Sequence, residues 1–419
     1  MTCASIVTIG DEIIIGQVVD TNSARLAGAL EQSGIHVRKM LSVPDDAVEI
    51  EKTLSEELSA SDIVISTGGL GPTKDDITKP VLARLSGSSA YIEHPGQMKM
   101  VHSILHGRGL DVLPVNLAQA QVPDKAEVIV NKLGTAPIMV FRQVRGGGTL
   151  YALPGVPHEA VGAIPAVMAD IRAHQKLQDI LHRSVMVYGI AESALSEKLA
   201  PWEDALPKEM HLAYLPNTLT GIRLRLSIYS GNSKEQEALL QREFGKLKLL
   251  LGNLLYSEED SDLQTAVGKL LKDSGKTLSA AESCTGGEIA HLITSVPGAS
   301  AYFLGSVTSY AVSVKEKVLG VSPAVIREKG VVSSEVAAAM AEGVRRLTGS
   351  DYAVSTTGLA GPSGDQFNPV GTVWIGVAGP SGTTTATFCF KHDRKRNIER
   401  FAACALNFLR LQIEKDLNH

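Results

Sequence analysis

Residues 63–72 read IVISTGGLGP, and this stretch decides the fold of the first part of the chain. The short apolar run from Ile63 to Ser66 predicts a buried strand. Three glycines follow it, at positions 68, 69 and 71. Glycines directly after a buried strand let main-chain N–H groups approach a phosphate, and the helix start that follows favours negative charge. The stretch therefore predicts an anion-binding loop at the carboxyl end of a strand in an α/β sheet.

The residues around this stretch alternate between strands and helices. We predict strands at 5–9, 36–43 and 63–66, and helices at 21–33 and 47–59. This order implies a parallel sheet with helices on both faces. Further strands and a loop are expected within 128–157 and a closing helix at 160–177. Residues 1–169 are therefore assigned to a first domain.

The pattern changes from about residue 183. Strands are predicted at 185–188, 212–215 and 222–229, and helices at 193–199 and 234–251. These elements make a small α+β domain, assigned to residues 170–256, and the polar run 257–262 is the predicted linker to a third domain at 257–419. The predicted fold class is α/β, with two three-layer α/β/α domains joined by the small α+β domain.

Composition and charge indicate an ordinary globular protein. Hydrophobic residues make up 44% of the chain and charged residues 20%. The net charge of −5 gives no global reason to expect binding to nucleic acid or to an anionic membrane. With no signal peptide and no apolar run of membrane-spanning length, a cytoplasmic location is expected. The cysteines Cys3, Cys284, Cys389 and Cys404 lack zinc-ligand spacing and are expected to be reduced thiols.

A second site is predicted at residues 281–287, which read AESCTGG. Ser283 stands where a strand at 277–280 turns into a helix, and main-chain N–H groups at such a turn can bind an oxyanion. A serine needs a base, and a desolvated lysine such as Lys315 can serve, with Tyr310 on the preceding strand end. Hydrolysis of an acyl or amide bond is one interpretation. A plain helix N-cap and tight turn is the other, and these residues alone leave both open.

Two aspartates follow the glycines of the first domain. Asp75 and Asp76 lie at the same helix start. Carboxylates beside a phosphate usually need a divalent cation to offset their repulsion, so a Mg²⁺-type site is predicted. A glycine turn with aspartate N-caps is the alternative.

Four blocks near the C-terminus resemble the C-terminal domain of the CinA family, which also occurs alone as the enzyme PncC. They are residues 281–287, Tyr310 with Lys315, residues 357–362 and residues 369–374. The resemblance implies an amidohydrolase that converts nicotinamide mononucleotide (NMN) to nicotinate mononucleotide and ammonia without a cofactor. By the same resemblance, Ser283 is the nucleophile, Lys315 its general base and Tyr310 part of the proton network.

The same domain offers a set of substrate-binding positions. Guanidinium groups can bind the substrate phosphate in a fork, and a glycine-containing turn after a strand suits main-chain contact with a ligand. For the arginines, an exposed basic helix start is the alternative. The predicted positions are Thr285, Gly286, Gly287, Thr357, Gly358, Ala360, Gly361, Arg394 and Arg400.

The first domain resembles the molybdopterin-binding fold shared by CinA N-terminal domains and molybdenum-cofactor adenylyltransferases. The matching segments are 9–12, Gly16 with 20–22, 43–46, 68–73, 131–137, and 153–157 with Glu159. The resemblance implies a diphosphatase that needs Mg²⁺, Mn²⁺ or Co²⁺ and splits ADP-ribose into AMP and ribose 5-phosphate. Asp45 and Asp76 would be its working carboxylates and metal ligands, with Gly69 and Gly71 on the phosphates. The predicted site also includes Gly68, Asp75 and Asp11, although a plain turn at Asp11 is the alternative.

The middle domain resembles the KH-like insert of full-length CinA proteins through residues 188–193 and 213–216. It has no Gly-x-x-Gly loop of the kind that binds nucleic-acid backbones, so a spacer or dimer element is favoured over nucleic-acid binding. Together the resemblances imply a homodimeric salvage enzyme of NAD metabolism. Two other functions stay open: a non-catalytic interaction protein related to competence or DNA damage, and pterin binding by the first domain.

Overall fold

The chain folds into two compact units. The computed structural model describes residues 2–73, 76–142, 144, 147–175, 177, 181–217, 219–228 and 234–418. One unit comprises residues up to 181, and the other comprises residues 182–228 together with the chain from 234 onward. Among the described residues, no helix is both long enough and apolar enough to cross a membrane.

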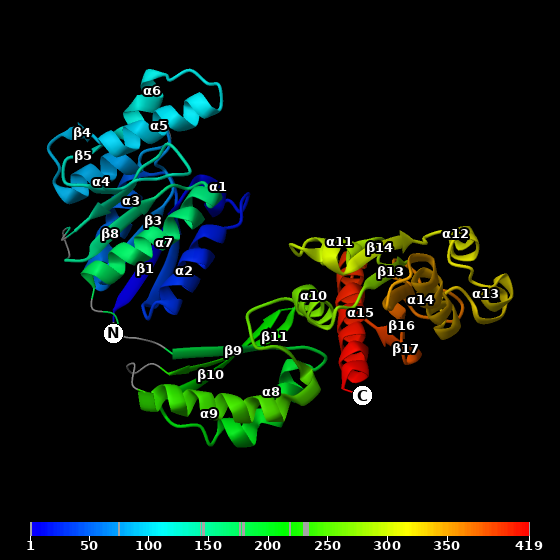
Figure 1. The fold of residues 1–419 in the computed structure, drawn as a ribbon. Helices are drawn as coiled ribbons and strands as arrows, with labels where there is room; N and C mark the ends of the chain where they lie inside the picture. Colours follow the sequence, from blue (N-terminus) through cyan, green and yellow to red (C-terminus); the bar gives the residue numbers. More distant parts are fainter. Residues whose placement is uncertain are drawn as a thin grey trace. The chain divides into compact units, whose positions relative to one another are not determined.

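A six-stranded sheet forms the centre of the first unit (Figure 1). Its strands, in the order β2-β1-β3-β8-β7-β6, are β1 (Cys3–Ile9), β2 (His36–Val43), β3 (Ile63–Thr67), β6 (Glu127–Ile129), β7 (Ile138–Phe141) and β8 (Thr149–Leu153). Strands β1, β2, β3 and β8 run parallel to one another, whereas β7 is antiparallel to both β8 and β6. The parallel sheet predicted from the first strands is confirmed, and the further strands expected within 128–157 are present, with β7 antiparallel. The chain between β7 and β8 is too short for the crossover that a parallel pair needs.

Helices cover both faces of this sheet. Ile63 and Ile65 pack with α2 (Thr21–Gln32) and α7 (Pro157–His174). Val64 packs on the other face with α3 (Ala47–Ala60) and α4 (Thr78–Ser86). Successive side chains of a strand point to opposite faces, so this alternation buries both sides of the sheet. The predicted three-layer arrangement is confirmed.

Several shorter elements complete the first unit. Strands β4 (Tyr91–Glu93) and β5 (Gln121–Pro123) form a small sheet. The helical segment between them in the sequence was not predicted. The remaining helices are α1 (Asp11–Ile14), α5 (Pro95–Gly107), α6 (Pro114–Leu117) and the 3-10 turn η1 (Ala118–Ala120).

The second unit begins with the predicted small α+β domain. Its sheet has the order β10-β11-β9-β12, from β9 (Leu181–Val187), β10 (Met210–Asn217), β11 (Gly221–Ile228) and β12 (Leu255–Ser257). Helices α8 (Glu192–Glu203) and α9 (Lys234–Leu251), with η2 (Gly252–Leu254) after them, pack through Leu195 and Phe244 onto Val185 and Leu224.

A five-stranded sheet forms the rest of the second unit. Its order is β14-β13-β15-β16-β17, from β13 (Leu278–Glu282), β14 (Phe303–Thr308), β15 (Tyr352–Gly358), β16 (Thr372–Gly379) and β17 (Gly382–Cys389). Helices α10 (Leu263–Ser274), α11 (Glu288–Thr294) and α15 (Arg394–Leu417) pack on one face, and α14 (Ser334–Thr348) covers the other. The short elements are η3 (Ala299–Ala301), α12 (Val312–Lys317) and α13 (Pro323–Lys329). Because β13, β14 and β15 are parallel, their carboxyl ends meet at one edge of the sheet.

Arg410 holds the small domain to the C-terminal domain. It is 1% exposed on α15 and donates hydrogen bonds to the main-chain oxygens of Asn253 (2.8 Å) and Leu255 (3.3 Å). Its Nη1 also binds both carboxylate oxygens of Glu414 at 2.9 Å. Asn253 and Leu255, just before the predicted linker, are therefore hydrogen-bonded to α15. The two domains form one compact unit.

We expect Arg410→Leu to destabilise this unit by about 2–4 kcal/mol, because two main-chain carbonyls and Glu414 lose the donor that the buried Arg410 supplies. Scanning calorimetry should show a lower melting temperature for the second unit's transition. Lys415→Ala, on the exposed side of α15, is the matched control and should lie within about 0.5 kcal/mol of the wild type. Equal melting temperatures for Arg410→Leu and the wild type would contradict the prediction.

Candidate functional site

The carboxyl end of β13 brings the predicted nucleophile and base together. Ser283 directly follows β13 and is 9% exposed, while Lys315 on α12 is fully buried. Lys315 Nζ donates a hydrogen bond to Ser283 Oγ at 2.9 Å and another to the main-chain oxygen of Ser309. A lysine amine in direct contact with a serine hydroxyl is the arrangement that a Ser-Lys hydrolase needs.

The buried position of Lys315 tunes its protonation. Burial lowers the pKa of Lys315 from 10.5 to about 8, and the neighbouring Cys284 opposes this only in part. At pH 7 about one molecule in ten then carries a neutral amine that can accept a proton. Burial also raises the pKa of the Cys284 thiol to about 12, so this cysteine is a packed, protonated side chain beside the serine.

Glu282, the last residue of β13, is a buried carboxylate that the sequence analysis missed. It accepts hydrogen bonds from the main-chain N–H groups of Gly287 (3.0 Å), Ile289 (3.0 Å) and Ala290 (2.9 Å). A charged residue at the end of a run of small buried residues was the available signal. The carboxylate therefore accepts hydrogen bonds from N–H groups at the start of α11 that were predicted to bind an oxyanion.

Two other main-chain donors lie next to Ser283. Within the described part of the chain, no acceptor on another residue is found for the N–H groups of Cys284 and Thr285. Both residues are buried, at 6% and 3% exposure. Buried N–H groups normally have a partner, so two such groups directly after a nucleophile can receive a negative oxygen from a ligand.

Some of the predicted substrate-binding residues shape the turn after Ser283, and others form hydrogen bonds within the protein. Gly286 and Gly287 have positive φ angles of 66° and 111°, which allow the tight turn after Ser283. The Thr285 hydroxyl is hydrogen-bonded to Thr356 Oγ1 at 2.7 Å. The Thr357 hydroxyl donates a hydrogen bond to the main-chain oxygen of Val331 at 2.8 Å.

Tyr310 and Arg394 form a second polar pair near this edge. Tyr310 is 63% exposed, and its hydroxyl accepts a hydrogen bond from Arg394 Nη2 at 3.0 Å. Arg394 Nη1 donates to the main-chain oxygen of Gly361 at 2.5 Å. The structure differs here from the expectation that Tyr310 passes a hydrogen bond between Ser283 and Lys315, because those two side chains bond directly. Tyr310 is instead placed to hold Arg394 against the 357–361 turn.

Asn397 supports the same turn, and Arg400 lies elsewhere. Asn397 is fully buried and was missed in the sequence analysis; its Nδ2 donates to the main-chain oxygens of Ala360 (3.0 Å) and His392 (2.9 Å). Arg400 lies over the ring of Phe390, 5.5 Å from its centre. Arg394 is thus brought to the turn, whereas the contact of Arg400 is with an aromatic side chain.

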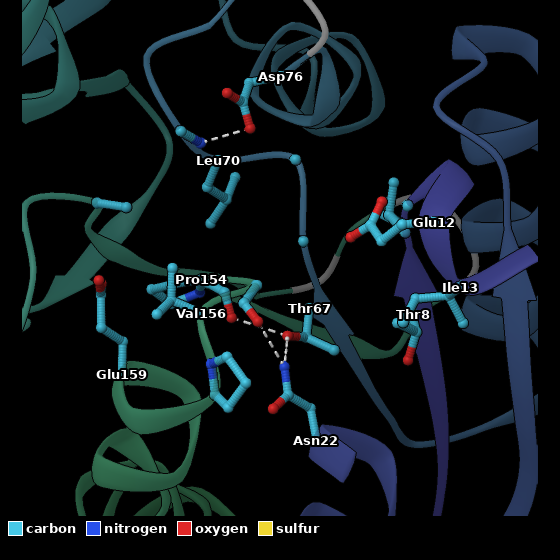
Figure 2. Close-up of a pocket in the computed structure, with 18 of the residues that line it drawn as sticks. Thr8, Glu12, Ile13, Asn22, Thr67, Leu70, Asp76, Pro154, Val156 and Glu159 are labelled. Atoms are coloured by element: carbon cyan, nitrogen blue, oxygen red, sulfur yellow. Dashed lines mark hydrogen bonds between the residues drawn. The ribbon is translucent and has the colours of Figure 1, made fainter. Parts of the chain in front are cut away.

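The first unit contains a cavity of about 480 Å³ at the carboxyl ends of β1, β3 and β8. Predicted site residues line it: Gly68, Gly69, Gly71, Asp45 and Asp76. Figure 2 shows Asp76, Glu12 and Glu159 around the space, with Asn22 bonded to Thr67 below. A Cβ on Gly69, whose φ is +65°, would lie 2.0 Å from Thr78 Oγ1, so the loop needs glycine at this position.

Three predicted carboxylates at or beside this cavity are engaged with the chain itself. Asp76 accepts hydrogen bonds from Gly71 N (2.8 Å), Thr73 N (2.9 Å) and the Thr73 hydroxyl. Asp11 and Asp45 each accept a bond from the other's main-chain N–H, at 3.2 and 3.0 Å. Asp75 lies outside the described residues.

These contacts bear on the predicted cation. Among the described residues, no group of three His, Cys, Asp or Glu side chains is arranged to hold a metal ion. The described carboxylates therefore do not fit a preformed cation site, and a dependence on a divalent cation stays a prediction.

Three further polar residues near this cavity were missed as site residues. Asn22 donates to Thr67 Oγ1 (3.1 Å) and to the main-chain oxygen of Gly155 (2.8 Å). Lys79 donates to the main-chain oxygens of Ala118, Gln119 and Gln121 at 3.0–3.3 Å, and burial lowers its pKa to about 8. Gln119 itself lines the cavity. Only Asn22 lies in a recognisable motif, so the others had no signal in the sequence.

Comparisons with known proteins match this two-site chain over its whole length. The probable molybdopterin binding domain matches residues 5–173, the damage-inducible protein CinA KH domain residues 182–257, and the CinA C-terminal domain residues 260–413. A solved structure of the protein CinA from Thermoplasma acidophilum is 35% identical and covers 41% of this chain and 98% of its own, with a TM-score of 0.37.

Relatives of full length are also found. The CinA-like protein of Flavobacterium psychrophilum is 41% identical over 416 residues, which is 99% of both chains. The CinA-like protein of Cytophaga hutchinsonii is 40% identical over 98% of both chains. With three matching domains in order and this identity along the full length, the chain belongs to the CinA family.

Proposed function

We propose that the second unit hydrolyses the carboxamide of NMN to nicotinate mononucleotide and ammonia. The observation that carries the proposal is the 2.9 Å contact between the Lys315 amine and the Ser283 hydroxyl. The pKa of Lys315, lowered to about 8 by burial, makes the amine a base at physiological pH. Membership of the CinA family supplies the expected substrate.

The proposed reaction passes through an acyl-enzyme. Ser283 Oγ forms a bond to the carboxamide carbon, its proton moves to neutral Lys315 Nζ, and the C=O electron pair moves onto oxygen. The carbon–nitrogen bond then breaks, and ammonia leaves with the proton held by Lys315. Water attacks the ester while Lys315 takes its proton, the bond from the carbonyl carbon to Ser283 Oγ breaks, and Lys315 returns the proton to Oγ as the carboxylic acid leaves. Arg394, held by Tyr310 and Gly361, is the candidate donor to the substrate phosphate.

A second activity is proposed for the cavity of the first unit. Its volume of about 480 Å³ and its glycine-rich wall suit a ligand that carries phosphates. The proposed reaction is hydrolysis of ADP-ribose between its two phosphates, giving AMP and ribose 5-phosphate. In this reaction Asp76 shapes the phosphate loop through Gly71 and Thr73. A pterin is the alternative ligand, and isothermal titration calorimetry with molybdopterin and with ADP-ribose distinguishes the two.

The substrates of the two proposed reactions have a common source. Breakdown of nicotinamide dinucleotides yields both NMN and ADP-ribose, so one chain would salvage two products as a cytoplasmic enzyme of NAD metabolism. A homodimer stays a prediction, which sedimentation of the purified protein tests. A non-catalytic interaction protein is the competing proposal, supported if the wild type turns over neither substrate but retains a protein partner.

Ser283→Ala and Lys315→Ala should each lower ammonia release from NMN by about 10³-fold or more, because the nucleophile and its base act as a unit. Ammonia is measured with a coupled glutamate dehydrogenase assay. Ser295→Ala, at an exposed serine after α11, is the matched control and should keep wild-type activity. Undiminished ammonia release by Ser283→Ala would reject the proposed role.

The pH profile of NMN hydrolysis should report the titration of Lys315. The neutral amine is the active form, so kcat/KM should rise about tenfold per pH unit below pH 8 and level off above it. Lys315→Arg should be inactive up to pH 10, because arginine stays protonated there. A wild-type profile that is flat from pH 6 to pH 9 would contradict lysine as the base.

Asp76→Asn should lower ADP-ribose hydrolysis by about 10²-fold, because the amide nitrogen cannot accept the bonds that shape the 71–73 loop. NMN hydrolysis should be unchanged. Phosphorus NMR measures the hydrolysis of ADP-ribose, with Mg²⁺, Mn²⁺ or Co²⁺ added in turn. A sample with a chelator serves as the metal-free control. Asp111→Asn, at an exposed aspartate, is the control. Equal loss of both activities in Asp76→Asn would point to a general folding defect instead.

A further inference from the structure

Glu282 is a fully buried carboxylate one residue before the nucleophile. Its hydrogen bonds in the described chain all come from main-chain N–H groups, those of Gly287, Ile289 and Ala290, at 2.9–3.0 Å. A buried charge with several charge-assisted hydrogen bonds is stable in place, whereas the same charge without them would be very costly. The carboxylate therefore holds the turn 284–287 and the first residues of α11 in one arrangement.

The main chain of Glu282 is tied to the other half of the catalytic pair. Its carbonyl oxygen accepts a hydrogen bond from Ser309 N at 2.7 Å. The carbonyl oxygen of Ser309 in turn accepts one from Lys315 Nζ. One residue thus connects the turn that carries Ser283 with the segment that carries the base, so a shift of Glu282 would change the Ser283–Lys315 geometry.

The side chain of Glu282 also decides which N–H groups remain for a substrate. It occupies the donors of Gly287, Ile289 and Ala290, and in the described chain no acceptor on another residue is found for the N–H groups of Cys284 and Thr285. A donor must be unoccupied and preorganised to stabilise the oxyanion of an acyl transfer. Cys284 and Thr285 meet both conditions, since they are buried in a turn whose far end is held by the carboxylate.

We propose that Glu282 is a positioning residue of the amidase site, and that the oxyanion formed from the substrate carboxamide is bound by the N–H groups of Cys284 and Thr285. The inference rests on the proposed amidase function and adds its oxyanion site. Glu282 touches neither substrate nor reacting atom; it acts through the turn that it holds.

Glu282→Gln tests the inference, because the glutamine amide keeps the shape and presents an N–H₂ group where a second acceptor is needed. We expect kcat for NMN to fall by about 10²-fold while KM changes less than about twofold, because the oxyanion is present only in the transition state. Calorimetric titration of NMN into Ser283→Ala, with and without Glu282→Gln, should give equal dissociation constants. Glu282→Asp, which keeps the charge and shortens the side chain by one carbon, should recover part of kcat.

The controls separate this inference from the amidase function itself. Glu288→Gln changes a half-buried glutamate at the first position of α11, directly after the turn, and should keep wild-type kcat. No ammonia release by the wild type would reject the amidase function. Wild-type turnover with an unchanged kcat in Glu282→Gln would overturn the positioning role alone. It would also be overturned if KM rose in proportion to the loss of kcat/KM, or if neither Glu282 variant folded by circular dichroism, since Glu282 would then serve ground-state binding or folding.

Discussion

The chemistry proposed for the second unit depends on one desolvated amine. Lys315 has no exposed surface, and its Nζ lies between the Ser283 hydroxyl and the Ser309 carbonyl. Water would hold this amine in its charged form; burial lowers its pKa to about 8 and makes it a base. The packing around α12 and β13 must therefore both exclude water and keep the two side chains in contact. The parallel strands β13, β14 and β15 make this possible, because they end at one edge and fix both segments.

The two units use their glycine turns in similar ways. In each, a turn rich in glycine follows a buried strand, and a nearby carboxylate accepts main-chain N–H groups of that turn. Asp76 does so for Gly71 and Thr73, and Glu282 for Gly287 and the residues after it. An acidic residue beside a glycine loop is thus not necessarily a metal ligand or a catalyst, because shaping the loop already satisfies its charge.

Regular elements could be predicted because their signal is local. The strands around 5–9 and 63–66 and the helix at 234–251 appear where periodicity places them, since burial of one face sets the spacing of apolar residues. The strands within 128–157 were expected without a direction, because strand direction depends on which neighbour a strand pairs with, and β7 is antiparallel. The pairing of Tyr310 with Arg394 was missed for a related reason: the two residues lie far apart in the chain and meet only when β14 and α15 pack on one sheet.

The sequence by itself determined the family, the α/β class, the glycine turns and the choice of Ser283 and Lys315 as the predicted nucleophile and base. Each of these depends on adjacent residues or on short, fixed spacings in the chain. Only the tertiary structure decided that Lys315 is buried and contacts Ser283, that Glu282 occupies the helix-start donors, and that Arg400 lies over Phe390. Burial and hydrogen-bond partners are properties of segments brought together from distant parts of the chain, and reactivity follows from them because a pKa depends on what surrounds the group in space.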